Sequence, residues 1–174
     1  MASLVDRMIR AAKLDVHLYE EVEADQTAMP QAVATVAISS LAAGIGSLGA
    51  LGLSGLLVGV IAALVGWFIW AFLTYFIGTK LLPEPGTKAD LGELMRTMGF
   101  SSAPGVLRVL GFVPVFGVII VLGASIWMLV AMIIAVRQAL DYRSTWRSVG
   151  VCLIGWIVQV VLFGMLFAAL GVRS

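Results

Sequence analysis

Few side chains in this chain could do chemistry, and their spacing argues against an active site. Gly44, Gly46 and Gly49 spell G-x-G-x-x-G, the fingerprint of a dinucleotide-binding loop. That motif holds a pyrophosphate only between a strand and the start of a helix in a βαβ unit, whereas here it follows an uncharged apolar segment. We interpret these glycines as small residues at a helix end, and we expect no nucleotide or other cofactor.

Metal-ligating and nucleophilic residues are equally sparse. The chain has one histidine, His17, and one cysteine, Cys152. Metal sites need several such ligands, and no grouping resembles a catalytic triad. No Asp or Glu lies between Gln26 and Pro83, between Leu94 and Leu140, or after Asp141, so the carboxylates that membrane proton relays use are missing from the apolar segments. We expect a protein that is not an enzyme and holds no metal.

One charge cluster is dense enough to suggest binding. It consists of Glu20, Glu21, Glu23 and Asp25. Charge runs usually just face water, and a solvated helix end is one interpretation. The other is a docking surface for a basic partner at the cytoplasmic face. Arg137 and Asp141, four residues apart, either pair with each other or contact these acids.

The composition indicates which solvent surrounds these residues. Hydrophobic residues make up 61% of the 174, charged residues only 12%, and the mean hydropathy is +1.06. A soluble domain carries about 25% charged residues. A net charge of +1 without clustered Lys and Arg gives no reason to expect nucleic acid. The sequence therefore predicts an all-α, multi-pass integral membrane protein whose main partner is the lipid bilayer.

The first 29 residues form a tail ahead of the apolar segments. Apolar side chains at helical spacing predict one amphipathic helix over residues 4–26, lying on the membrane surface. A second amphipathic stretch over 91–98 follows Thr87 and Asp90, which resemble a capping box, and is also expected at the surface. The apolar face of the first helix comprises Val5, Met8, Ile9, Ala12, Val16, Tyr19 and Val22.

Residues 30–172 form the expected membrane domain. An apolar helix of about 20 residues crosses a bilayer, and we expect five spans, of which the third is short and contains Arg108. Small residues recur every fourth position in the first two spans, a pattern that lets helices approach closely in lipid. The expected spans are 30–48, 53–78, 100–113, 114–136 and 150–172. The small residues are Thr35, Ser39, Ala43 and Ser47, followed by Gly55, Gly59 and Ala63.

The basic residues set the expected orientation. With five spans and the tail in the cytoplasm, nine of the eleven Lys and Arg fall inside, as the positive-inside rule requires. If the third segment did not span, Arg137, Arg143 and Arg147 would move outside. The prediction is therefore a cytoplasmic N-terminus, in the cell (inner) membrane if the source is prokaryotic.

Several local patterns resemble the Yip-one domain family of Ypt/Rab-interacting membrane proteins, especially its prokaryotic branch, over essentially the whole chain. The resemblance rests on Leu14-Asp15 with Tyr19-Glu20-Glu21, Gln31-Ala32, Gly111-Phe112-Val113-Pro114, Ile126-Trp127 and Ala135-Val136-Arg137-Gln138-Ala139-Leu140. It implies a five-span bundle with a cytoplasmic N-terminus and no catalytic activity; the eukaryotic relatives bind Rab GTPases. The eukaryotic tail pattern Asp-Leu-Tyr-Gly-Pro is not intact, because Glu20-Glu21 follow Tyr19.

Two functions remain open at this point. The first is a membrane scaffold or interaction protein that binds a membrane protein partner or a second copy of itself. The alternative is a small channel or transporter. For the first function the candidate docking residues are Asp15, Tyr19, Glu20, Glu21, Glu23, Asp25, Arg137 and Asp141.

Overall fold

The computed structural model describes residues 2–169, and every regular element in that range is helical. In the N-terminal tail these are α1 (Leu4–Ala12), α2 (Val16–Ala24) and the 3-10 turn η1 (Gln26–Ala28). The remaining elements are α3 (Met29–Gly46), α4 (Leu48–Phe76), the π-helical turn η2 (Ile77–Leu81), α5 (Leu91–Ser101), the 3-10 helix η3 (Ala103–Phe112), α6 (Phe116–Ala139) and α7 (Thr145–Ala169).

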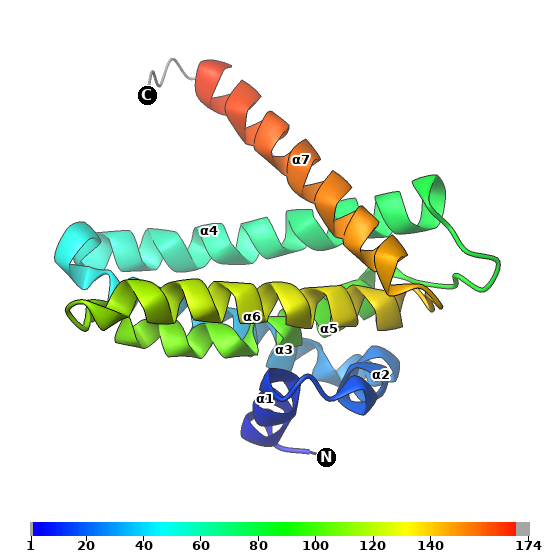
Figure 1. The fold of residues 1–174 in the computed structure, drawn as a ribbon, viewed down its shortest axis with the longest axis horizontal. Helices are drawn as coiled ribbons and strands as arrows, with labels where there is room; N and C mark the ends of the chain where they lie inside the picture. The colour runs from blue at the N-terminus through cyan, green and yellow to red at the C-terminus, as the bar shows by residue number, and fades with distance from the viewer. Residues whose placement is uncertain (1, 170–174) are drawn as a thin grey trace.

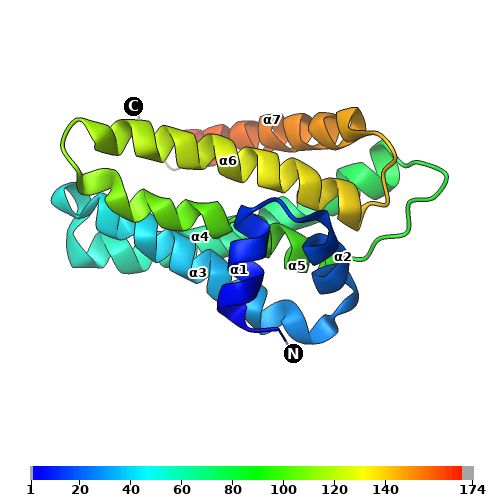
Figure 2. The same ribbon diagram turned by 60° about the horizontal axis from the view of Figure 1, so that its bottom comes forward.

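The long helices run back and forth along one axis, and α7 leans away from the others toward its C-terminal end (Figure 1). Figure 2 shows α3, η3 and α6 side by side, with α1 lying against the middle of the bundle and α2 nearer the end that holds the α6–α7 turn. Three helices, Gln26–Gly46, Ser54–Leu81 and Phe116–Ala139, are long and apolar enough to cross a membrane, and Thr145–Val161 is a shorter apolar stretch. The expected all-helical membrane architecture is confirmed to that extent.

The third apolar segment differs from the prediction. α5 and η3 together lead from one end of the bundle to the other, so this segment starts at Leu91 and not at residue 100. α5 packs against α2, α3, α4 and α6, and Leu94, Met98 and Phe100 are buried. The apolar side chains at 94 and 98 thus pack within the protein and are not free to contact lipid, while the position of this helix relative to the membrane surface stays a prediction. The capping box also sits three residues later, because Asp90 and Glu93 exchange the two hydrogen bonds.

The tail is not one helix, contrary to the prediction. Leu14 has a φ of 60°, in the left-handed region that stops a helix. The Asp15 side chain then accepts a hydrogen bond from the His17 amide at 3.0 Å and caps α2. The break rotates the apolar residues apart: Tyr19 and Val22 are buried in the protein, whereas Val5 and Ile9 are exposed.

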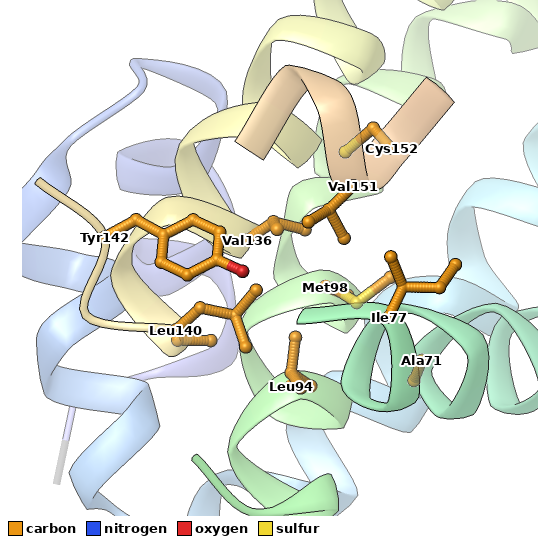
Figure 3. Close-up of a cluster of buried hydrophobic side chains, with 10 residues drawn as sticks. Ala71, Ile77, Leu94, Met98, Val136, Leu140, Tyr142, Val151 and Cys152 are labelled. Carbon is orange, nitrogen blue, oxygen red and sulfur yellow. The ribbon is translucent and has the colours of Figure 1, made fainter. Parts of the chain in front are cut away.

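A core cluster joins four segments at the end of the bundle near η2 (Figure 3). Tyr142 enters it from the α6–α7 turn, and its hydroxyl lies 2.9 Å from the Gly78 carbonyl oxygen and 2.7 Å from that of Leu82. This hydroxyl therefore ties the end of α4 to the turn after α6. The cluster comprises Ala71, Ile77, Leu94, Met98, Val136, Ala139, Leu140, Tyr142, Val151 and Cys152.

The glycine fingerprint has a packing role in the fold. A Cβ at Gly46 would overlap the carbonyl oxygen of Arg108, and one at Gly44 would lie 3.3 Å from Leu56. The glycines of α3 therefore let η3 and α4 approach its backbone. A similar contact occurs between α3 and α5, where a Cβ at Gly99 would lie 2.7 Å from that of Ala32.

Candidate partner-docking site

The tail is fixed to the bundle through contacts with α5 and α6. Arg96 on α5 is buried, and its Nε donates to the Val22 carbonyl at 2.8 Å while a terminal nitrogen donates to that of Glu23. These carbonyls belong to the last turn of α2, where a cation is favourable. The other tail helix, α1, is also bonded to the bundle: the indole nitrogen of Trp127 on α6 donates to the Ala12 carbonyl at 2.8 Å.

An ion-pair network holds α1 against α2. Arg7 is only 4% exposed, and it contacts Glu21 at 2.8 Å and Asp25 at 2.7 Å. The same guanidinium donates to the Gln31 side chain of α3 at 3.0 Å. Arg10 pairs with Glu21 at 2.6 Å. A buried Arg keeps its charge because the two carboxylates supply the interactions that water would otherwise provide.

The titration of these acids follows from their partners. Hydrogen bonds from Thr27 and then Arg7 lower the pKa of Asp25 to about 2. Hydrogen bonds from Arg10, and more weakly from Arg7, lower the pKa of Glu21. Asp15 also has a lowered pKa, chiefly through its hydrogen bond from Arg10, which lies 2.8 Å away. These three candidate docking acids therefore form ion pairs within the tail itself.

The remaining acids form a negative patch, which we call the acidic face: Glu20 and Glu23 of α2, Glu93 of α5, and Asp141 after α6. Glu20 and Asp141 are exposed, and Glu20 accepts a hydrogen bond from Gln138 at 3.0 Å. Burial raises the pKa of Glu23 to about 7, helped by the charges of Asp141, Glu93 and Glu20 and opposed by Arg96. Within the described residues these carboxylates form no ion pair with Lys or Arg.

Two other candidates have roles within the fold. Tyr19 is fully buried, its hydroxyl lies 3.5 Å from the Ala11 carbonyl oxygen, and burial raises its pKa. Arg137 donates to the carbonyls of Tyr142 and Arg143 at 3.2 and 3.3 Å. It closes the α6–α7 turn in this way and, among the described residues, forms no ion pair with Asp141.

The loop before α5 lies at the same end of the molecule as the α6–α7 turn. Glu84 accepts from the Arg143 amide at 3.1 Å and pairs with the Arg147 side chain at 3.3 Å. Arg147 also donates to the Pro83 carbonyl at 3.0 Å. The 82–90 loop and the 140–144 turn are therefore joined at one end of the bundle, next to α2.

The small residues of the first two expected spans fall into two groups, one buried in helix contacts and one bordering a cavity. Thr35 and Ser39 are buried, and Ser39 donates to the Ser102 carbonyl at 2.6 Å, which joins α3 to the α5–η3 junction. Others border a cavity of about 600 Å³ between α3, α4, η3 and α6. A Cβ at Gly59 would meet no atom within 4 Å. The positions that border the cavity are Ala43, Ser47, Gly55, Gly59 and Ala63.

Sequence reasoning missed Arg7 and Arg96 as site residues, although they carry the docking of the tail. On the helix surface Arg96 lies beside Gly92 and Phe100, away from the face formed by Leu94, Met95 and Met98, so the spacing alone gives no signal that its side chain is buried. Within residues 2–169, no group of three His, Cys, Asp or Glu side chains is arranged to hold a metal ion.

Comparison with known proteins gives one match. The family model of the Yip1 domain matches residues 23–167, which include α3 to α6 and most of α7. No curated protein and no solved structure matches the chain.

Proposed function

The chain belongs to the Yip1 domain family, and on that basis we propose that it is a non-enzymatic membrane interaction protein whose acidic face docks a basic segment of a membrane partner. The observation that carries this proposal is the division of the acids. Asp15, Glu21 and Asp25 are compensated by Arg7 and Arg10, whereas Glu20, Glu23, Glu93 and Asp141 form no ion pair with Lys or Arg in the part of the chain that the structure describes, and the charges of the other three act on Glu23.

Such a face is suited to recognition. A partner that brings Lys or Arg to it gains favourable charge interactions at encounter, and complementary charge chiefly sets specificity and association rate. Burial is the main cause of the raised pKa of Glu23, and a positive partner would offset the repulsion from Asp141, Glu93 and Glu20 that adds to it. The face is built on α2, α5 and the 140–144 turn, all held by the buried Arg96 and Tyr142, so it needs little ordering when a partner binds.

We further propose that five segments cross the membrane, with the tail in the cytoplasm. In support, α5 and η3 lead from the end that holds the acidic face to the end where Gly46 meets η3. Nine of the eleven basic residues then lie on the tail side, which the positive-inside rule places in the cytoplasm. In this arrangement the acidic face is open to cytoplasmic partners.

Site-specific photo-crosslinking in native membranes tests the docking proposal. A photoreactive residue at Asp141 should give a discrete adduct, either with another membrane protein or with a second copy of this chain. Charge reversal by Glu20→Lys should abolish it. The same probe at Val118, which is 70% exposed on α6, serves as the control. An adduct at Asp141 that survives Glu20→Lys would overturn the electrostatic docking.

A channel or transporter is the second candidate function, favoured by the cavities that border Arg108 within the bundle. Purified protein in proteoliposomes distinguishes the two. The interaction protein should show no more solute flux than empty vesicles. Robust, selective flux would replace the docking proposal with transport.

A further inference from the structure

A partly open cavity of about 380 Å³ is lined by residues of α3, α4, α5, η3, α6 and α7, so every apolar segment contributes to its wall. Its polar lining is Ser39 and Ser40 of α3, Ser102 at the α5–η3 junction, Arg108 of η3 and Gln159 of α7, together with the indoles of Trp67 and Trp70. No acidic side chain lines it. The cavity therefore offers one positive charge and hydrogen-bond groups, with nothing negative to oppose an anion.

Arg108 lacks a counterion of its own. The sequence has no Asp or Glu between Gln26 and Pro83, between Leu94 and Leu140, or after Asp141, and Glu93, the one acid of α5, accepts from the Asp90 amide at the start of that helix. Three buried nitrogens of cavity-lining residues, Arg108 Nε and the Nε1 atoms of Trp67 and Trp70, find no acceptor among the described residues. An uncompensated Arg within a membrane costs several kcal/mol and usually marks a functional site.

The rest of the cavity is apolar. Its walls include Val36, Met98, Met128, Met132 and Trp156, and flexible methionines adapt to irregular ligands. The neighbouring cavity of about 600 Å³ shares Ser40, Ala63 and Arg108 with it. An occupant whose charged end lies at Arg108 therefore has apolar space on either side.

We propose that this cavity binds an amphipathic oxyanion, a carboxylate or phosphate group carried on an acyl chain. The oxyanion pairs with the Arg108 guanidinium and accepts hydrogen bonds from the Trp67 and Trp70 indoles, while the acyl chain lies against the apolar wall. Guanidinium and oxyanion form charge-assisted pairs with two parallel hydrogen bonds. A free inorganic anion would leave the apolar wall without a partner and is not the expected ligand.

Native mass spectrometry of the full chain in an uncharged detergent tests this proposal. The probes are oleate, dioleoyl phosphatidylglycerol, dioleoyl phosphatidylcholine and inorganic phosphate. Wild type should retain one oleate or one phosphatidylglycerol, and whichever persists at the lower concentration identifies a free fatty acid or a phospholipid as the source. Arg108→Gln should weaken that adduct at least tenfold. Lys80→Gln, which removes an exposed cation outside the cavity, should not weaken it.

A second variant guards against misfolding of the first. Trp67→Phe combined with Trp70→Phe keeps an aromatic side chain at both positions and removes both N–H donors, and it should weaken the adduct several-fold while the protein elutes as wild type on size exclusion. Equal binding of the amphiphiles by wild type and Arg108→Gln would overturn the proposal. So would retention of phosphatidylcholine or inorganic phosphate in preference to both anionic amphiphiles.

Discussion

Arg96 of α5 donates a hydrogen bond of 2.8 Å from its Nε to the Val22 carbonyl of α2, 74 residues earlier in the chain. This contact joins the N-terminal tail to the membrane bundle, and it does so with a cation that is 5% exposed. The acidic face exists because α2 is held in this place. The stability of the site is therefore tied to a residue outside it.

Replacing Arg96 should release the tail. In Arg96→Met the Val22 and Glu23 carbonyls lose their donors, and a hydrogen bond to a charged group contributes about 1.5–3 kcal/mol. Hydrogen exchange of the residue 16–24 amides should become markedly faster, while the amides of α6 stay protected. Lys88→Met, which removes an exposed cation from the same end, is the control. Unchanged exchange in Arg96→Met would show that other contacts hold α2.

Protonation of Glu23 should tighten the tail as the pH falls. Its pKa is raised from about 4.5 to about 7 in the folded protein, so the folded state binds the proton more tightly. Tail docking is then strongest below about pH 4.5 and weakens as the pH rises through 7. The ionised Glu23 carboxylate is disfavoured first by burial and then by the negative charges of Asp141, Glu93 and Glu20, whereas the positive charge of Arg96 favours it.

Hydrogen exchange of α2 between pH 5 and 8, corrected for the intrinsic pH dependence of exchange, measures this effect. Glu23→Gln should flatten the profile and protect the tail better than wild type at pH 8. Asp6→Asn, at an exposed acid on α1, should leave the profile unchanged. A profile that keeps its slope in Glu23→Gln would assign the titration to another group.

Close packing of α3 on α5 should make Gly99 intolerant of a side chain. In Gly99→Ala the new Cβ would lie 2.7 Å from that of Ala32 and 3.2 Å from the Ala32 backbone, and overpacking of this kind costs about 1–3 kcal/mol. A lower thermal unfolding midpoint in detergent is expected. Gly123→Ala is matched to it, because a Cβ at Gly123 on α6 meets nothing within 4 Å. That variant should unfold no earlier than wild type.

The sequence predicts the helices that rest on long uncharged runs. α3, α4 and α6 begin and end within a few residues of expectation, because runs such as 114–136 have no other stable form in lipid. The packing interpretation of the glycine pattern is confirmed for Gly44 and Gly46, whereas the surroundings of Gly49 lie outside what the structure describes.

The tail and α5 were harder to predict because tertiary contacts decide them. The spacing of apolar residues from Val5 to Val22 fits one helix, and nothing in that spacing reveals that Leu14 breaks it. Arg96 lies within α5, and a charged side chain taken by itself favours a position at the membrane surface. In the folded protein two carbonyls of α2 accept hydrogen bonds from Arg96, so this side chain can be buried. Which acids of the tail are neutralised depends on the positions of Arg7 and Arg10, and these follow from the break.

The tail, the 82–90 loop and the 140–144 turn should all face the cytoplasm, and cysteine labelling in intact cells tests this arrangement most directly. Cys152 is the chain's one cysteine, so a Cys152→Ala background accepts single cysteines at Lys88, Arg143 and Val115, the last being 84% exposed in the opposite turn. A membrane-impermeant maleimide should label Val115→Cys only, with Lys88→Cys and Arg143→Cys reacting after permeabilisation. Labelling of Arg143→Cys but not Lys88→Cys from outside would contradict the account, because α5 and η3 would then not cross the membrane.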